Sequence, residues 1–220
     1  MLRSAMAAFL LILVSGVFSQ NVFSLQDPVS SKKFNAEKYS AVRGTPFLIN
    51  KWLKGSVTTP KGVYQNIELK FNVYDNSLFF NMDDETFELQ DNIISFTLKP
   101  KSDDSTSFLV YRKGISGADL RDNQFVQVLL DAPTALYKLD VKQLSEMSEI
   151  NTGIVKTFTN NSKYYLSKNK QIQFIKINRK EILNALSDKQ EKLQLYINEK
   201  KLSFKKDTDI IELLRYYNSL

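Results

Sequence analysis

Hydrophobic and polar residues alternate along residues 62–74, and this alternation predicts a β-strand with one buried face. The apolar positions share one parity and are Val63, Ile67, Leu69, Phe71 and Val73. The polar positions share the other parity and are Tyr64, Asn66, Glu68, Lys70, Asn72 and Tyr74. Asp75 and Asn76 then predict a turn, because both residue types tolerate positive φ and bond to their own backbone.

Three more strands are expected before Pro100. Their apolar positions are Leu78, Phe80 and Met82 in the first, Phe87 and Leu89 in the second, and Ile94, Phe96 and Leu98 in the third. Polar residues at 83–85 and 91–92 supply the turns between them, and Pro100 ends the last strand because proline cannot donate to a sheet ladder. Four strands joined by short turns predict an antiparallel meander with one solvated face.

The remaining chain is expected to add strands and then helices. Apolar runs predict strands at residues 108–111, 125–130, 136–141, 154–158, 164–166 and 171–177. Asn178 with Glu181, and Asp188 with Glu191, are spaced like capping boxes, and Asp207 is placed to cap a last helix. The predicted fold class is therefore mainly β: an antiparallel meander forming a bent sheet, sandwich or open barrel, with about three short C-terminal helices.

The first residues resemble a secretory signal. Arg3 is followed by an apolar stretch at 5–14 and by small residues at 17–19. We therefore expect a signal peptide at 1–19, an N-terminal arm at 20–43, an antiparallel β domain at 44–178 and a helical segment at 179–220. A membrane anchor is the alternative for the apolar stretch, which is shorter than the roughly 20 residues that a bilayer requires. No other stretch comes near that length, so no transmembrane segment is expected after cleavage.

Composition limits where the protein works and what binds it. The chain has 43% hydrophobic and 12% aromatic residues, as globular proteins do, and it has no cysteine for disulfides. Without Arg3 the side-chain charge is 29 − 24 = +5, and the excess lies late in the chain. Acidic residues interleave with these cations, so attraction to anionic envelope surfaces is expected rather than nucleic-acid binding. The expected location is the periplasm or the outer surface of a bacterium.

The sequence excludes several kinds of catalysis. There is no histidine, which excludes Ser-His triads, His-based zinc sites and imidazole proton transfer. Residues 83–85 and 103–104 cluster carboxylates that a calcium ion could use, although solvated acidic turns explain them more simply. A carboxylate-based hydrolase stays open as an alternative, because a pair of carboxylates across a cleft leaves no sequence motif. No cofactor, metal ligand or catalytic residue is assigned.

Four residues are weak candidates for contacting a ligand or partner. Trp52 is the only tryptophan and lies close to Phe47, so the two could form an aromatic platform, although a core plug at one end of the sheet is the simpler interpretation. Gly114 and Gly117 lie in a flexible stretch that could act as a binding loop or as an ordinary connection.

Parts of the chain resemble an uncharacterised family of exported, β-rich proteins of Gram-negative bacteria. The resemblance rests on Gly44, Pro46, Phe47, Leu48, Trp52, Gly55, Val57, Gly62, Tyr64, Asn66, Leu69 and residues 73–75, and on 183–189, 196–197, 205–207, 213–214 and 216–217 near the end. The family has no established activity, so the resemblance implies export and fold but no site residues.

These observations predict an exported envelope protein that is not an enzyme and that binds or interacts with a partner. The partner is either another protein or an apolar ligand such as a lipid, carried in the periplasm. A carrier would hide a cavity lined by residues such as Phe71, Phe80, Phe96 and Trp52. An interaction protein would instead fill that space with its own side chains and expose a sheet edge or an apolar patch.

Overall fold

The computed structural model describes residues 31–33, 36–90, 92–100, 108–150 and 153–220. Eleven strands form one open sheet in the order β1-β6-β5-β4-β3-β7-β8-β9-β10-β11-β12, and β2 pairs with β11 off this path. The strands are β1 (Ser31–Lys33), β2 (Val42–Arg43), β3 (Leu53–Thr59), β4 (Gly62–Asn72), β5 (Ser77–Met82), β6 (Glu85–Leu89), β7 (Ser95–Leu98), β8 (Leu109–Arg112), β9 (Val126–Leu130), β10 (Ala135–Glu149), β11 (Gly153–Lys168) and β12 (Gln171–Ile175).

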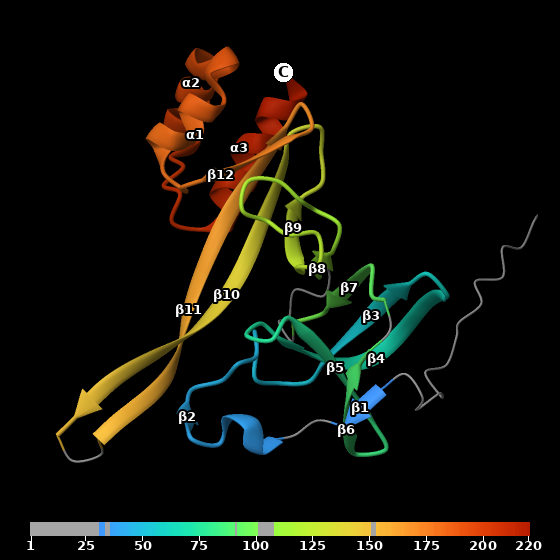
Figure 1. Cartoon of the computed structure of the whole chain (residues 1–220). Coiled ribbons are helices and arrows are strands. Elements are labelled where there is room, and N and C mark those ends of the chain that lie inside the picture. The colour runs from blue at the N-terminus through green and yellow to red at the C-terminus, as the bar shows by residue number, and fades with distance from the viewer. Residues whose placement is uncertain (1–30, 34–35, 91, 101–107, 151–152) are drawn as a thin grey trace, which may run out of the picture.

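Three α-helices follow the last strand, and two 3-10 turns complete the described elements. The helices are α1 (Arg179–Ala185), α2 (Gln190–Lys200) and α3 (Asp207–Ser219), and the 3-10 turns are η2 (Ala36–Tyr39) and η3 (Ser187–Lys189). In Figure 1 the helices lie at one end of the molecule, and β1 and β3–β7 lie at the other end. The strands β10 and β11 form a long ribbon that begins beside the helices and runs past β1 and β3–β7. The predicted fold class is confirmed.

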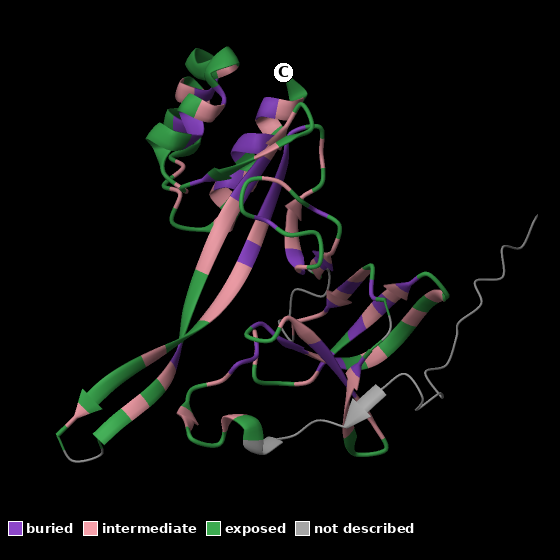
Figure 2. Cartoon of the chain, in the orientation of Figure 1, coloured by how far each residue is buried: buried purple, intermediate pink, exposed green. Residues whose placement is uncertain are grey.

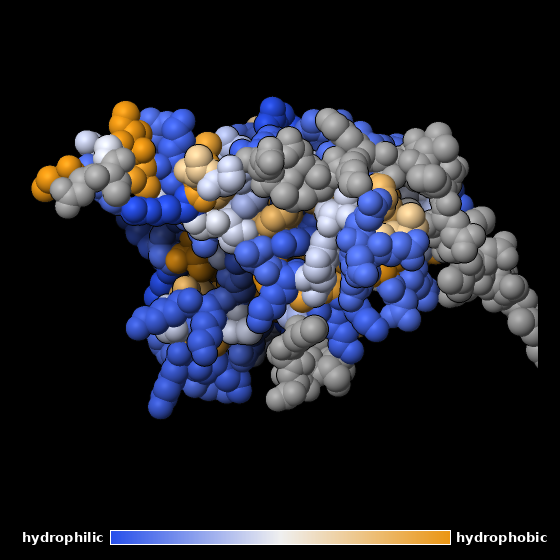
Figure 3. Space-filling model, turned by 90° about the horizontal axis from the view of Figure 1, so that it is seen from below, coloured by the Kyte–Doolittle hydropathy of each residue, from blue (hydrophilic) through white to orange (hydrophobic). Residues whose placement is uncertain are grey.

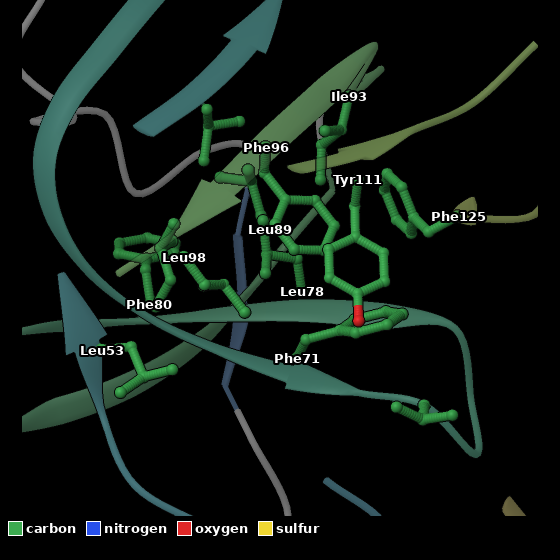
Figure 4. Close-up of a cluster of buried hydrophobic side chains, with 13 residues drawn as sticks. Leu53, Phe71, Leu78, Phe80, Leu89, Ile93, Phe96, Leu98, Tyr111 and Phe125 are labelled. Carbon is green, nitrogen blue, oxygen red and sulfur yellow. The ribbon is translucent and has the colours of Figure 1, made fainter. Parts of the chain in front are cut away.

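Aromatic side chains fill the core of the part built from β3–β8. Phe71 lies 5.2 Å from Phe96 and 5.1 Å from Tyr111 between ring centroids, and the ring of Phe96 stacks on Tyr111 at 4.9 Å. Phe125 meets Phe96 edge-on at 4.9 Å. Figure 4 shows these rings pointing toward one another from several strands. Each ring buries roughly 150–250 Å², so this cluster is a main source of stability for this end of the sheet.

One half of β4 has the opposite orientation from the one that its alternation predicts. Asn66 has a φ of 62°, and the pairing with β3 shifts register between Gly55 and Ser56, so Asn66 forms a β-bulge. Before the bulge Tyr64 pairs with the buried Val57, whereas Val63 is 39% exposed. The expected inward orientation of Val63 is wrong, because the extra residue reverses the face of every position before it.

The predicted four-strand meander is confirmed for three of its strands. β4, β5 and β6 pair in sequence order, and Asp83 and Asp84 form the turn between β5 and β6 with positive φ. β7 does not pair with β6 but crosses over to β3, where Phe96 lies opposite Val57. The connection from β6 to β7 is therefore a crossover, and residue 91 of the turn expected at 91–92 lies outside the described residues.

The second core lies under the helices. Ile210, Leu213 and Leu214 of α3 are fully buried, together with Leu136 of β10 and Leu166 of β11. Figure 2 shows the buried face of α3 lying against these two strands. Because α3 carries its apolar residues on one side, it covers the strands as an amphipathic helix does.

Only one of the three expected helix caps is made. The Asn178 side chain accepts a hydrogen bond of 3.0 Å from the Glu181 amide, as a capping box requires. Asp188 instead accepts from Lys168 Nζ at 2.6 Å and from the Tyr217 hydroxyl at 2.7 Å. Asp207 is the first residue of α3 and accepts from Lys138 and Tyr164 of the sheet. The two remaining predicted caps are wrong because these carboxylates bind basic and tyrosine side chains instead.

The part of the N-terminal arm that the structure describes belongs to the sheet. β1 pairs with β6, and β2 pairs with β11 in parallel, whereas the other described pairs are antiparallel. The Tyr39 hydroxyl donates to Asp75, which also accepts from Lys38 at 2.6 Å and from the buried Asn72. The expected signal peptide at 1–19 lies outside the described residues.

The two faces of β4 near its end predict unequal effects of a new carboxylate. Phe71→Asp is expected to prevent folding, because it places a charge without a partner among the packed rings. Lys70→Asp should leave the fold intact with a loss of about 1–2 kcal/mol, since Lys70 lies over the Phe47 ring at 4.2 Å. Thermal melts monitored by circular dichroism would measure both, and a folded Phe71→Asp variant would contradict the assigned register.

Acid should loosen the contact between the helices and the sheet. Hydrogen bonds from Lys168 and Tyr217 lower the pKa of Asp188, so this carboxyl stabilises the folded state above its unfolded pKa of about 3.9. That contribution disappears as the pH falls through the lower folded pKa. Urea unfolding between pH 5 and pH 3, about the range where such a carboxyl titrates, should show a smaller loss of stability in Asp188→Asn than in wild type. Equal losses would contradict this assignment.

Candidate interaction site

The sequence candidates Trp52 and Phe47 lie together, but in packed surroundings. Lys70 Nζ is 4.2 Å from the Phe47 ring centroid and 5.7 Å from that of Trp52, and burial lowers the pKa of Lys70. Phe47 is buried and meets Phe79 edge-on at 6.0 Å. The half-buried Lys70 side chain therefore lies near the rings of both Phe47 and the half-buried Trp52.

Gly114 and Gly117 lie in the connection between β8 and β9. Both have positive φ, of 79° and 145°, which explains the choice of glycine. The Gly114 amide donates to the carbonyl of Asp122 at 2.7 Å, and Gly117 forms a bridge with Leu120. A Cβ at Gly117 would lie 3.0 Å from Ile172 Cβ, so the loop packs closely on β12.

The carboxyl groups of Asp119 and Asp188 connect separate parts of the chain through hydrogen bonds. Hydrogen bonds from Lys163 and Tyr165 lower the pKa of Asp119, and similar bonds lower that of Asp188. A carboxyl group kept ionised in this way suits an ion pair, whereas the general acid of a hydrolase needs a raised pKa. The described residues contain no cluster of three metal-ligating side chains, and residues 103–104 lie outside them.

Two hollows in the described part of the protein are open to solvent and are lined mostly by polar and charged residues. One, of about 700 Å³, lies beside η3 and α2 and is lined by residues such as Asp188, Lys189 and Glu191. Another, of about 550 Å³, lies on β3, β4 and β7 between Lys54, Lys99 and Phe108. An apolar carrier would instead need an enclosed hydrophobic cavity.

The ribbon formed by β10 and β11, here called the arm, is the element that these candidates do not include. Its strands pair in unbroken register over 15 residue pairs, from Ala135 with Ser167 to Glu149 with Gly153. At its base Leu136 and Tyr165 are fully buried. Figure 1 shows the far half extending away from both cores. A two-stranded ribbon exposed in this way is marginally stable alone, so the rest of the protein has to hold it.

The middle of the arm is fixed by partly buried polar contacts. Asp140 accepts a hydrogen bond of 2.7 Å from the Tyr111 hydroxyl and one of 3.2 Å from Ser162. Tyr111 is fully buried in the aromatic core, and this burial raises its pKa. The phenol therefore stays protonated and donates to Asp140, which links the arm to the core.

A second anchor lies farther along β11. Phe158 is buried, and its ring centroid is 5.7 Å from that of Tyr39 and 5.2 Å from that of Tyr74. Gly44 lies directly against it, since a Cβ at that position would be 3.6 Å from Phe158 Cβ. The chain that leads into β2 therefore packs under the arm.

Beyond these anchors the arm ends in exposed hydrophobic residues. The exposed fractions are 65% for Met147, 103% for Ile150 and 70% for Ile154, and we call these three residues the apolar tip. Among the described residues only Leu195 on α2 is a similarly exposed large hydrophobic residue. In Figure 3 hydrophobic surface gathers at the left end of the molecule, where the arm ends. Met147 and Ile154 point to opposite faces of the ribbon, so the end is apolar on both sides.

Ion pairs lie just behind the apolar tip. Arg43 Nη1 and Nη2 contact the two carboxylate oxygens of Glu149 at 2.5 and 3.1 Å, and Lys156 pairs with Glu146 at 3.0 Å. Exposed pairs of this kind contribute little stability, about 0–1 kcal/mol each. They leave the region behind the tip without net charge, which is compatible with contact to a partner surface.

Sequence reasoning missed the arm. It assigned short strands to 136–141 and 154–158 and no structure to the polar residues between them. One signal was present: Met147, Ile150 and Ile154 stand in a stretch otherwise rich in polar residues, where no core face requires them.

Comparisons with known proteins return nothing: no protein-family model, no curated protein and no solved structure matches this chain. The resemblance to exported Gram-negative proteins thus stays a prediction. No helix in the described part of the chain has the length and apolar character needed to cross a membrane.

The Phe158 anchor can be tested against a matched phenylalanine. Phe158→Ala should cost about 3–5 kcal/mol, because it leaves a cavity between Tyr39 and Tyr74. Hydrogen exchange should rise in β2 and in the far half of β11 but not in α3. Phe174→Ala, at a side chain that is 48% exposed, should cost about 1 kcal/mol or less. Equal effects of the two substitutions would show that Phe158 does not anchor the arm.

Proposed function

We propose that this chain is an exported bacterial envelope protein that acts without catalysis, by binding another protein through the far half of the arm. The apolar tip carries the proposal. Monomeric proteins rarely expose neighbouring large hydrophobic side chains, and such patches mark interaction sites. Here the exposed residues lie at the end of an element that both cores and the N-terminal segment hold in place.

Burial of the apolar tip does not supply enough free energy for tight binding. Burying Met147, Ile150 and Ile154 would contribute roughly 5–9 kcal/mol, at about 1.5–3 kcal/mol per side chain. Association costs about 4–15 kcal/mol before any net affinity results. The tip alone therefore gives a weak contact, and the strands behind it have to add to the binding.

The alternatives receive less support. A carrier of a lipid would use a cavity at Phe71, Phe80 and Phe96, but Phe71 and Phe96 pack on each other and on Tyr111. A hydrolase would use a carboxyl with a raised pKa, whereas the pKa values of Asp119, Asp188 and Asp209 are all lowered. Export rests on residues 1–19 and on the absence of cysteine.

Site-specific photo-crosslinking tests this proposal in cells. A photoreactive amino acid at Ile150 should give a crosslink to a discrete protein, whereas the same amino acid at Leu195, which is 70% exposed and lies on α2, should not. Combining Met147→Ser and Ile154→Ser in the chain that carries the Ile150 probe should reduce the crosslink about tenfold, since two exposed apolar contacts are lost. The melting temperature should stay unchanged.

Two results would contradict the proposal. Crosslinks that are equally strong at Leu195 would show that the arm is not the binding element. Native mass spectrometry of the mature protein could also find a bound lipid that persists in the serine variant, and this result would favour the carrier.

A further inference from the structure

The outer edge of β10 has no strand partner over most of its length. β9 pairs with β10 only at Leu136, Tyr137 and Lys138, and from Leu139 to Glu149 no strand of the described part pairs with this edge. β11 differs, because β2 pairs with it at Lys156 and Thr157 and β12 at its other end. An open edge presents unpaired N–H and C=O groups to which another strand can add.

We propose that two copies of this chain pair through this edge, antiparallel and about a two-fold axis at Leu144. The proposal rests on the proposed function and specifies its partner. In a symmetric antiparallel pair one residue lies opposite itself, and the others pair at equal distances on either side of it. Each choice of the central residue therefore defines one register, and the side chains that it places opposite each other can be compared.

The register centred on Leu144 is complementary at every position from 141 to 147. Leu144 lies opposite Leu144, and Gln143 lies opposite Ser145. Lys142 lies opposite Glu146, and Val141 lies opposite Met147. The two-fold axis makes each of these last contacts twice, so the interface contains two ion pairs and two apolar pairs. Cross-strand pairs of these types each contribute about 0.2–1 kcal/mol.

The neighbouring registers are not complementary. A centre at Lys142 or at Glu146 places like charges opposite each other. A centre at Gln143 places Asp140 opposite Glu146 twice, and a centre at Ser145 places Leu144 opposite Glu146. Like charges that lie directly opposite are destabilising, and a carboxylate opposite leucine makes no favourable pair, so among these five registers the side chains favour the one centred on Leu144.

Lys142 has no salt-bridge partner among the described residues, although the charge of Asp140 in the same strand acts on it. Glu146 pairs with Lys156 across the hairpin. In the paired arms each Glu146 would lie between Lys156 of its own chain and Lys142 of the other copy. The second copy would therefore place a carboxylate directly opposite Lys142.

The same arrangement places Met147 of the apolar tip against the other copy. Met147 of one copy lies opposite Val141 of the second, beside an open groove of about 350 Å³. Residues from the turn between β4 and β5, from β10 and from the loop before β9 line this groove, among them Val73, Tyr74, Leu139 and Val141. One interface would thus cover both the open edge and the exposed Met147 side chain.

Charge exchange between copies provides the decisive test. Lys142→Glu alone and Glu146→Lys alone each create two like-charge pairs in a dimer of identical chains. An equal mixture of the two variants restores two opposite-charge pairs in the mixed dimer. Sedimentation equilibrium of the mature chain should show dimers for wild type, an about tenfold or greater loss of affinity for each variant, and recovery in the mixture.

Cysteine crosslinking tests the register, because the natural chain has no cysteine. Leu144→Cys should form a disulfide-linked dimer rapidly under mild oxidation, since residues directly opposite in a sheet lie within disulfide reach. Ser145→Cys, which faces Gln143 in the proposed register, should react more slowly. Leu195→Cys on α2 reports random collisions and should react slowest.

Three other outcomes would overturn the pairing of two copies, and each points to a different partner or interface. A wild-type monomer throughout the concentration series, with a crosslink from Ile150 to a different protein, would leave the proposed function standing and remove the second copy. A monomer whose apolar tip drives binding to phosphatidylglycerol vesicles would overturn both proposals. A dimer that ignores the charge exchange and the Leu144 disulfide would place the interface elsewhere.

Discussion

The pairing of β10 with β11 is the interaction on which the rest of the structure depends. Its 15 residue pairs run from the helical core past the aromatic core and then into solvent. The helices pack on its base through Leu136 and Leu166, and the aromatic core reaches its middle through Tyr111 and Asp140. Each core is thus positioned by its contact with the same two strands.

Anchoring in the middle gives the free half of the arm a fixed direction. Asp140 and Phe158 are held by groups from separate parts of the chain, so bending the ribbon would break a partly buried hydrogen bond or an aromatic contact. A binding element with few accessible conformations loses less entropy when its partner arrives. The fixed direction of the arm therefore helps a small apolar tip and a short strand edge to form a specific contact.

The sequence predicted those elements whose apolar face is buried. The strands β4 and β5 followed from alternation, and α1 from the Asn178 cap, because burial of one face leaves a period in the sequence. The crossover of β7 to β3 was not predictable, since short connections favour neighbours and nothing local marks a longer route.

The candidate site, which is the far half of the arm, was the least predictable part because its residues are exposed and do not pack on a core. Residues 142–150 bury no face, so they carry no period from which a strand could be inferred. The bulge at Asn66 likewise gives no signal beyond an asparagine. Asp188 and Asp207 resembled caps because aspartate suits both a helix start and an ion pair, and only the tertiary structure decides between the two roles.

The position of β2 also bears on the order in which the chain folds. Arg43 leaves the ribosome early, yet its partner Glu149 follows 106 positions later, and β2 itself lies against β11. Contacts of such separation form late, because the intervening chain must be ordered first. The N-terminal segment is therefore synthesised first, but β2 can join the sheet only after β11 has been synthesised, whereas the partner of β1, strand β6, is available much earlier.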